Sequence, residues 1–374
     1  MIPLDRTRQA IEEGIRQGLH SGAQLYASVN GEAVADGALG EVTRDHLMLW
    51  LSSSKPVAAV ALARLWERGL LDLDDPVARY IPEFAANGKE EITLRHLLTH
   101  TAGIRMLDTG WPRDPWDAIV ARICAMKPEP RWPPGEKAGY NQASSWFILG
   151  EVIRRLDGRT FDRYVREEIF EPLGMSDSWI GMPRDRYLSY KDAGRIAAMW
   201  NTEKSPSEPH GWDSEARCTS VHPGGNGYGP MRELGRFYEM LLARGRQILS
   251  PQSVEALSAR HRVGMMDSTF RHLMDWGLGF IPNSAMYGEE TVPYAYGHHA
   301  SRRAFGHSGF RSSVAFADPE HGLAVALAFN GTPSNEAHER RIRAVLDALY
   351  EDLGLGNVGE GVTPSRAGTS PAPT

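Results

Sequence analysis

The residues of this chain best suited to chemistry are Ser52 and Lys55, a serine three residues before a lysine. An apolar run over residues 57–66 follows, and its composition predicts a buried helix. Residues three apart on a helix share a face, and the backbone N–H groups at its start have no partner. A lysine buried against a serine hydroxyl loses its proton easily and can help activate the serine as a nucleophile. The same spacing also occurs where a serine caps a helix and the lysine is exposed, so the rest of the chain must distinguish the two.

A second pattern suggests a metal site. His96 and His100 stand four residues apart in a segment, 92–103, whose threonine cap and terminal glycine predict a helix. That spacing suits a metal ion, but the glutamate of the zinc-protease motif is missing, because Leu97 follows His96. We therefore expect no metal and no other cofactor, and we expect His100 to be a hydrogen-bonded structural residue.

The composition is that of a soluble globular protein, with 374 residues, 41% of them apolar and 24% charged. A net charge of -6 without any basic block argues against nucleic acid or an anionic membrane as a partner. There is no apolar run long enough to span a bilayer, and the N-terminal residues lack the pattern of a signal peptide. Cys124 and Cys218 are far apart and belong to no metal or redox motif, so we expect free thiols and a cytoplasmic location.

Strand patterns lie at both ends of the chain and helical patterns dominate the middle. Because the strand patterns at both ends are antiparallel in type, we expect one sheet built from both ends, with a helical insertion between them. Two irregular segments, 105–133 and 183–230, are rich in Trp, Pro or Gly, and they either shape a site or pack on the surface. The expected strands are 23–29, 32–40, 276–280, 312–317 and 323–329, and the expected helices include 5–18, 144–156, 160–170, 232–244 and 338–353.

Further stretches follow the Ser52 block in a fixed order. They comprise 51–84 around Ser52 and Lys55, 92–103, Pro134-Gly135 with Tyr140, 171–175, and 305–310 with His307. In this order they resemble the serine β-lactamase and penicillin-binding-protein family, and most closely its class C-related branch of esterases, D-aminopeptidases and peptidases. The five blocks together favour the catalytic interpretation of Ser52 over the helix cap.

The resemblance implies a role for each matching residue. Ser52 would be the acylated nucleophile, and Lys55 would keep its hydroxyl ready for deprotonation. Tyr140 would pass the proton to the leaving group and later activate water. The backbone N–H groups of Ser52 and Phe310 would form the oxyanion hole. His307 would lie on a strand at the edge of the cleft, where it either binds substrate or transfers a proton, or only orders the cleft.

Two departures from the family pattern bear on the substrate. The tyrosine motif is normally Tyr-x-Asn, and this chain has Gln142 at its third position, with Asn141 before it. Gln142 adds a methylene, which would displace its hydrogen bond to substrate, and Asn141 could replace it only if the backbone changed register. His307 stands where lactamases carry lysine, so an anchor for a substrate carboxylate there is weak or conditional. Both changes favour an esterase, amidase or acyltransferase that acts on a less anionic substrate.

The resemblance therefore predicts an α/β protein of the α+β type with a β-lactamase-like fold, an antiparallel sheet flanked by helices and carrying an inserted helical lobe. We expect one catalytic domain over 1–355, with a sheet lobe from 1–50 and 225–355 and a helical lobe from 51–224, followed by a disordered tail over 356–374. The expected activity is serine hydrolysis of small-molecule esters or amides through an acyl-enzyme, with carboxylesterase first. The alternatives are a D-aminopeptidase or amidase, a weak β-lactamase, an acyltransferase, or a non-catalytic penicillin-recognising sensor.

Overall fold

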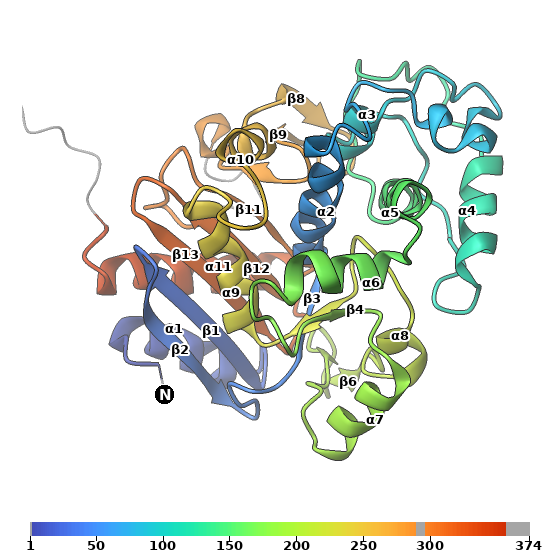
Figure 1. Ribbon diagram of the computed structural model, residues 1–374. Helices are drawn as coiled ribbons and strands as arrows, with labels where there is room; N and C mark the ends of the chain where they lie inside the picture. Colours follow the sequence, from blue (N-terminus) through green and yellow to red (C-terminus); the bar gives the residue numbers. More distant parts are fainter. Residues whose placement is uncertain (1, 289–295, 357–374) are drawn as a thin grey trace, which may run out of the picture.

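A six-stranded antiparallel sheet in the order β10-β11-β12-β13-β1-β2 forms one half of the computed structural model, which describes residues 2–288 and 296–356 (Figure 1). Chain segments from both ends meet in this sheet, since β1 pairs with β13 and with β2, as the sequence predicts. The strand bounds are β1 Gly22–Val29, β2 Glu32–Gly40, β10 Ile281–Pro282, β11 Phe305–Ser308, β12 Ser313–Asp318 and β13 Leu323–Phe329.

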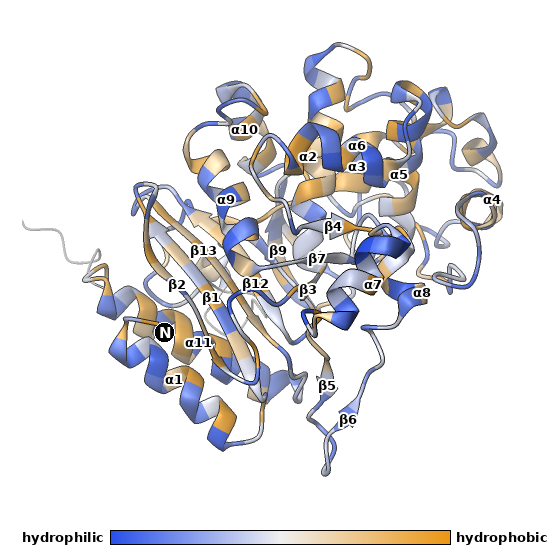
Figure 2. Cartoon of the chain, turned by 60° about the horizontal axis from the view of Figure 1, so that its bottom comes forward, coloured by the Kyte–Doolittle hydropathy of each residue, from blue (hydrophilic) through white to orange (hydrophobic). Residues whose placement is uncertain are grey.

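Helices cover both faces of this sheet. α1 (Asp5–Arg16) and α11 (Asn335–Asp352) lie together on one face, and α9 (Met231–Leu242) lies on the other (Figure 2). Along β13 the large apolar residues pack in the cluster with α1 and α11, and the alanines between them pack in the cluster with α9. The alanines allow close approach, and at Gly235 of α9 an added Cβ would lie 2.1 Å from the Tyr26 ring. The period-2 pattern of the strand therefore decides which helix each face receives.

The other half of the molecule is mainly helical. Its central helix, α2, is buried on almost every side and packs against α5, which explains why its sequence is apolar all round. The helices are α2 Lys55–Glu67, α3 Leu94–Leu98, α4 Trp116–Ala125, α5 Ser144–Asp157, α6 Phe161–Val165 with a π turn over Arg166–Phe170, α7 Arg184–Asp192, α8 Glu215–Thr219 and α10 Pro251–Ser258. Short strands complete it: β3 Met48–Leu51, β4 Trp179–Ile180 and β7 Gly227–Gly229 in one sheet, with the pairs β5 Trp200–Asn201 and β6 Glu208–Pro209, and β8 Arg262–Asp267 and β9 His272–Trp276.

One predicted strand is wrong, one predicted helix is too long, and one predicted region is not described. Residues 276–280 are not a strand, because β9 ends at Trp276 and the chain turns at Gly279 with φ +79°. The helix predicted over 92–103 is confined to α3, since His100 has φ +58° and ends the helical path. The tail predicted over 356–374 lies outside the described residues after Gly356. Within residues 2–288 and 296–356, no helix has the length and apolar character needed to span a membrane.

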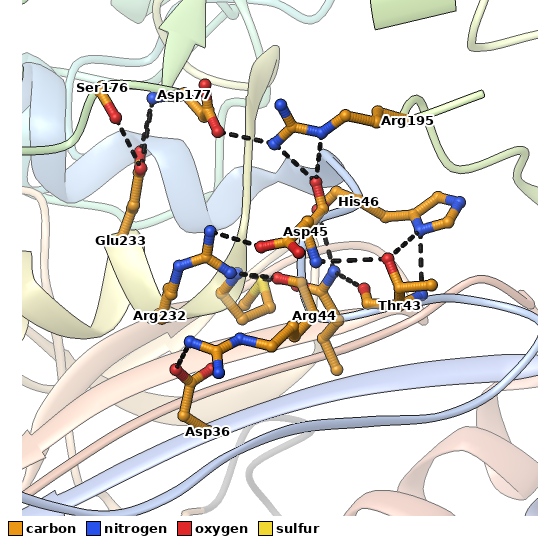
Figure 3. A network of polar contacts seen from close by, with 12 residues as sticks. Asp36, Thr43, Arg44, Asp45, His46, Ser176, Asp177, Arg195, Arg232 and Glu233 are labelled. Atoms are coloured by element: carbon orange, nitrogen blue, oxygen red, sulfur yellow. Dashed lines mark hydrogen bonds and ion pairs between the residues drawn. The ribbon is translucent and has the colours of Figure 1, made fainter. Parts of the chain in front are cut away.

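A polar network fixes the loop that leads into β3 (Figure 3). Arg232, at the start of α9, pairs with Asp45 of this loop at 2.8 Å. Arg195 donates to the Asp45 carbonyl at 2.8 Å and pairs with Asp177 at 2.6 Å. Glu233 accepts from the Asp177 backbone N–H at 3.0 Å. Three separate segments of the chain thus hold the entry to the strand that precedes the predicted nucleophile.

A buried histidine that contacts α11 should make the stability of the protein depend on pH. His20 accepts a hydrogen bond from Arg341 (Nη1 to Nδ1, 3.0 Å), and burial, with the charge of Arg341, lowers its pKa from 6.5 to about 3. Between these values the unfolded chain binds a proton that the folded chain does not, so the free energy of unfolding falls as pH falls below 6.5. Between pH 7.5 and pH 5, we expect the free energy of unfolding to decrease by about 2 kcal/mol less in His20→Gln than in wild type, because glutamine does not titrate. Urea unfolding of both proteins at the two pH values checks this, and equal losses would contradict it.

Candidate active site

Ser52 lies in a short 3₁₀ turn, Ser52–Ser54, that connects β3 to α2. The residue before it, Leu51, has φ 51° and ψ -133°, a conformation that a non-glycine residue adopts only when its surroundings hold it. The neighbouring serines supply contacts that do so. Ser53 Oγ donates to the His307 carbonyl (3.2 Å), and Ser54 Oγ donates to the Leu51 carbonyl (2.7 Å). The turn that presents Ser52 is therefore bound both to its own strand and to β11.

Lys55 is fully buried and faces Ser52, as the spacing predicts. Its Nζ donates to Ser52 Oγ at 2.9 Å and to the Gly224 carbonyl at 2.6 Å. Burial lowers the pKa of Lys55 well below its ordinary value, which makes the neutral amine accessible. The alternative of a helix cap followed by a surface lysine is excluded, because the Lys55 side chain is 0% exposed.

Tyr140 also contacts Ser52. Its hydroxyl donates to Ser52 Oγ at 2.8 Å, and its ring lies 5.1 Å from Lys55 Nζ. The β8–β9 hairpin holds its backbone: Asp267 Oδ1 accepts from the Tyr140 N–H at 3.2 Å, and Arg262 pairs with the same carboxylate at 3.0 Å. The three side chains that the sequence proposed as catalytic are thus joined by hydrogen bonds through Ser52 Oγ.

The two amides after Tyr140 have separate environments. Asn141 is buried, its Nδ2 donates to the Ile104 carbonyl at 3.1 Å, and its Oδ1 accepts from the Ser145 N–H at 3.2 Å. Its backbone N–H donates to His100 Nδ1 at 3.1 Å, so His100 is a hydrogen-bonded structural histidine, as predicted. Gln142 is exposed and lines the cavity beside Ser52. Asn141 is therefore committed to internal bonds, and Gln142 is the amide available to a ligand.

This difference predicts that replacing each amide residue with alanine changes stability by a different amount. Asn141→Ala leaves buried backbone groups without partners, which costs about 1–3 kcal/mol of stability for such a group. Gln142→Ala removes no internal hydrogen bond among those described for the chain, so we expect its unfolding free energy to stay within about 0.5 kcal/mol of wild type. Denaturant unfolding of the two variants measures both values. A larger loss in Gln142→Ala than in Asn141→Ala would contradict this assignment.

His307 is on β11, on a strand as predicted, but it lies behind Tyr140. The ring centroids of the two residues are 6.1 Å apart, and His307 is 1% exposed. Burial, with the charge of Lys55, lowers its pKa well below 6.5, so the imidazole is neutral. Nδ1 lies 2.8 Å from the Ser308 carbonyl, which can only accept, so Nδ1 carries the hydrogen and Nε2 is an acceptor.

Phe310, the other predicted oxyanion residue, follows the end of β11 and is 46% exposed in the cavity. Gly309 brings this segment against the turn of Ser52, since an added Cβ there would lie 2.5 Å from the Trp50 carbonyl oxygen. The Gly309 N–H donates to the Ser313 carbonyl at 2.8 Å, which fixes the bend before Phe310. Close approach at Gly309 explains why a glycine is needed two residues after His307.

Ser52 opens into a cavity of about 630 Å³. Tyr140, Gln142 and Phe310 line it, whereas Lys55 and His307 lie beneath its surface in the part of the chain that the structure describes. The irregular segments of the sequence analysis do shape the site. They contribute Trp111, Trp212, Arg217, His222, Gly224 and Gly225, and the remaining wall includes Phe270, His272, Arg311, Asn335, His338 and Glu339.

Sequence reasoning missed the parts played by Gly224 and His222. The Gly224 carbonyl is an acceptor for Lys55, and His222 has its ring 5.1 Å from Trp111 and 4.9 Å from Phe147. Burial, with the charge of Lys55, lowers the pKa of His222 to about 3, so it presents a neutral imidazole to the cavity. The glycine run that begins at Gly224 is visible in the sequence, but its contact with Lys55 is not.

Comparisons with known proteins find relatives of this chain both in sequence and in fold. The family model described as Beta-lactamase matches residues 7–350. The Esterase/beta-lactamase LipL of Mycobacterium tuberculosis (strain ATCC 25618 / H37Rv) is 26% identical over 83% of this chain and 77% of its own length. A penicillin-binding protein homologue from Caulobacter crescentus superposes with a TM-score of 0.75 at 29% identity, over 93% of this chain and 97% of that one. A family VIII carboxylesterase superposes with a TM-score of 0.76 at 27% identity, with the same coverage of each chain.

Proposed function

The chain belongs to the beta-lactamase family of serine hydrolases, and we propose that it is a carboxylesterase with Ser52 as its nucleophile. One observation carries the proposal: Ser52 Oγ lies within hydrogen-bond distance of both Lys55 Nζ and Tyr140 OH at the wall of a cavity. A nucleophile needs a base within this distance, and a buried amine of lowered pKa and a phenol are both present. The mixed names of the relatives leave amide and β-lactam substrates as outcomes of the test.

The proposed reaction is acyl transfer in two steps. Ser52 Oγ attacks the ester carbonyl, and its proton passes to the neutral amine of Lys55, which lies within hydrogen-bond distance. Tyr140 then gives a proton to the leaving alkoxide, so that an alcohol departs and an acyl-enzyme remains. Water enters and gives a proton to the Tyr140 tyrosinate, the resulting hydroxide cleaves the Ser52 ester to a carboxylic acid, and Ser52 Oγ takes its proton back from Lys55. The N–H groups of Ser52 and Phe310 would stabilise the oxyanion of each tetrahedral intermediate, and Gln142 would hydrogen-bond the substrate.

The environment of His307 supports an ester over a β-lactam. Lactamases place a cation at this position, but a neutral, buried imidazole offers no charge to a substrate carboxylate there. We give His307 the role of ordering the site, through its carbonyl on Ser53 and its ring behind Tyr140.

Parallel assays distinguish the candidate substrates. We expect the highest kcat/KM with p-nitrophenyl butyrate, a lower value with nitrocefin and a lower value with a D-alanine anilide. A dominant rate with nitrocefin would make the enzyme a β-lactamase, and a dominant rate with the anilide would make it a D-peptidase. Product release to an added alcohol instead of water would make it an acyltransferase, and no turnover of any of the three would favour a penicillin-recognising sensor.

Two further expectations of the sequence remain proposals. We propose a single catalytic unit over 1–355 whose two lobes meet at Ser52, which is supported by β3 and α2 carrying the serine between sheet and helices. We propose a cytoplasmic location, which is supported by Cys124 and Cys218 being buried and unpaired.

A further inference from the structure

Arg217 of α8 lies in the wall of the active-site cavity without an anionic partner among the described residues. Its guanidinium is half-buried and forms no side-chain hydrogen bond or ion pair with the rest of residues 2–288 and 296–356. Burial without a compensating carboxylate lowers the pKa of Arg217. Partly desolvated cations in folded proteins are normally paired, so an unpaired guanidinium in the lining of the cavity is suited to a partner from outside the chain.

The carboxylates closest to Arg217 in sequence are already neutralised. Asp213 pairs with Lys191 at 2.9 Å, and Glu215 pairs with Arg184 at 2.7 Å. Glu339 also lines the cavity, from α11, but it makes no ion pair with Arg217 in the described structure. Arg217 therefore lacks an ion-pair partner among the described residues because the acidic residues near it in sequence pair with other cations, and not because acidic residues are absent.

Aromatic rings hold the guanidinium in place. Its Cζ lies 4.8 Å from the centre of the Trp111 ring and 5.6 Å from that of the Trp212 ring. Trp212 is itself stacked on His210 at 3.9 Å. Rings against the guanidinium orient it and leave its N–H edge as the part able to donate. This arrangement is preorganised for a planar acceptor that approaches from the cavity.

The backbone that carries Arg217 is also fixed. Its carbonyl accepts from Asn226 Nδ2 at 2.8 Å, and Asn226 is 2% exposed. The next residue, Cys218, is fully buried, and its carbonyl accepts from the Met182 N–H at 2.9 Å. Arg217 is therefore presented by an anchored turn and is not a side chain on a free surface loop.

The second arginine of the cavity shows the opposite arrangement. Arg311 pairs with Glu203 at 2.6 Å and donates to Asn335 Oδ1 at 2.6 Å. Its charge and donors are used within the chain. Of the two arginines in the lining, only Arg217 keeps its donors for a ligand.

We propose that the substrate carries a carboxylate, separate from the ester that reacts, and that Arg217 binds it between Trp111 and Trp212. This inference rests on the proposed function for the identity of the reacting group, and it names the substrate class as half-esters of dicarboxylic acids or esters of comparable charge. The proposal also puts the binding site for the substrate carboxylate at a different position from that in lactamases. The neutral His307, which lies beneath the cavity surface, gives no anchor at the lactamase position, and Arg217 gives one in the cavity lining.

The test measures binding to Ser52→Ala protein, so that it does not depend on turnover. The ligands are the monomethyl and dimethyl esters of succinic, glutaric, adipic and suberic acids, with Kd read from quenching of tryptophan fluorescence. At least one half-ester is expected to bind about tenfold more tightly than its dimethyl ester, as a charge-assisted hydrogen bond would give. In Ser52→Ala with Arg217→Gln the two esters are expected to bind alike, and Arg217→Lys is expected to keep part of the difference.

A matched control removes a positive charge elsewhere. Arg163 is exposed and pairs with Glu167 outside the cavity, so Arg163→Gln in the Ser52→Ala protein should leave the half-ester preference at its full value. Equal affinity of half-ester and dimethyl ester across the series, or no binding of any half-ester, overturns the carboxylate proposal. A preference for the half-ester that persists in Arg217→Gln also overturns the carboxylate proposal. A protein that binds half-esters through Arg217 and yet hydrolyses no ester would contradict only the esterase assignment.

Discussion

Replacing Ser52 with alanine is expected to reduce kcat/KM for p-nitrophenyl butyrate by about 10⁴-fold or more, because removal of the nucleophile eliminates the covalent route altogether. Ser52 Oγ accepts hydrogen bonds from both Lys55 and Tyr140, so no other hydroxyl of the turn occupies the same position. The change removes the acceptor of two hydrogen bonds, one of them from the fully buried Lys55, so the unfolding free energy should fall by about 1–3 kcal/mol.

Ser53 is the matched control for this variant. It is the next residue in the same turn, but its hydroxyl donates to the His307 carbonyl and faces Ser313 Oγ at 3.0 Å, away from the cavity. Ser53→Ala should lose stability, by about 1 kcal/mol for a buried hydrogen bond, and should retain most of its turnover. If the two variants lost comparable activity, the turn and not the Ser52 hydroxyl would be the essential feature.

The second large effect is expected at Tyr140. Tyr140→Phe keeps the ring against Trp276, Phe270 and His100, with ring centroids 5.7, 4.9 and 4.8 Å away, and removes only the hydroxyl that reaches Ser52. Loss of a general acid and base costs about 10²- to 10⁴-fold, and the decrease should appear in kcat.

Gln142→Ala gives the comparison for Tyr140→Phe. Gln142 lines the cavity and holds at most a hydrogen bond to substrate, so its loss should cost about fivefold and appear mainly in KM. Steady-state kinetics of the two variants across pH separate the roles. Equal losses in kcat would mean that Tyr140 is not the base, and that Lys55 acts alone.

The parts of the site that are local in sequence could be predicted, and the parts that depend on distant contacts could not. The spacing of Ser52 and Lys55 placed both on one helical face, and the alternation in the strands placed both chain ends in one sheet. The Gly224 carbonyl reaches Lys55 across 169 residues, and no periodicity encodes such a contact. The strand expected over 276–280 failed for a local reason, since apolar residues alternating with two glycines match a strand in composition although the chain turns at Gly279.

Charge pairing was the least predictable feature. Asp213, Glu215 and Arg217 lie within five positions of one another in the sequence, but this proximity does not determine which groups pair. The fold instead gives each carboxylate to a cation from another segment and leaves Arg217 facing the cavity. The likeness of His307 to a lactamase lysine could be judged from sequence, but its position behind Tyr140 needed the structure.

The most direct measurement of the central claim is the intact mass of the protein after incubation with a fluorophosphonate. Wild type is expected to gain one phosphonyl group, located on the peptide that contains Ser52, and Ser53→Ala is expected to gain the same group. Ser52→Ala is expected to keep its unmodified mass under identical conditions. An unmodified wild-type protein, or an adduct that persists in Ser52→Ala, would contradict the assignment of Ser52 as the nucleophile.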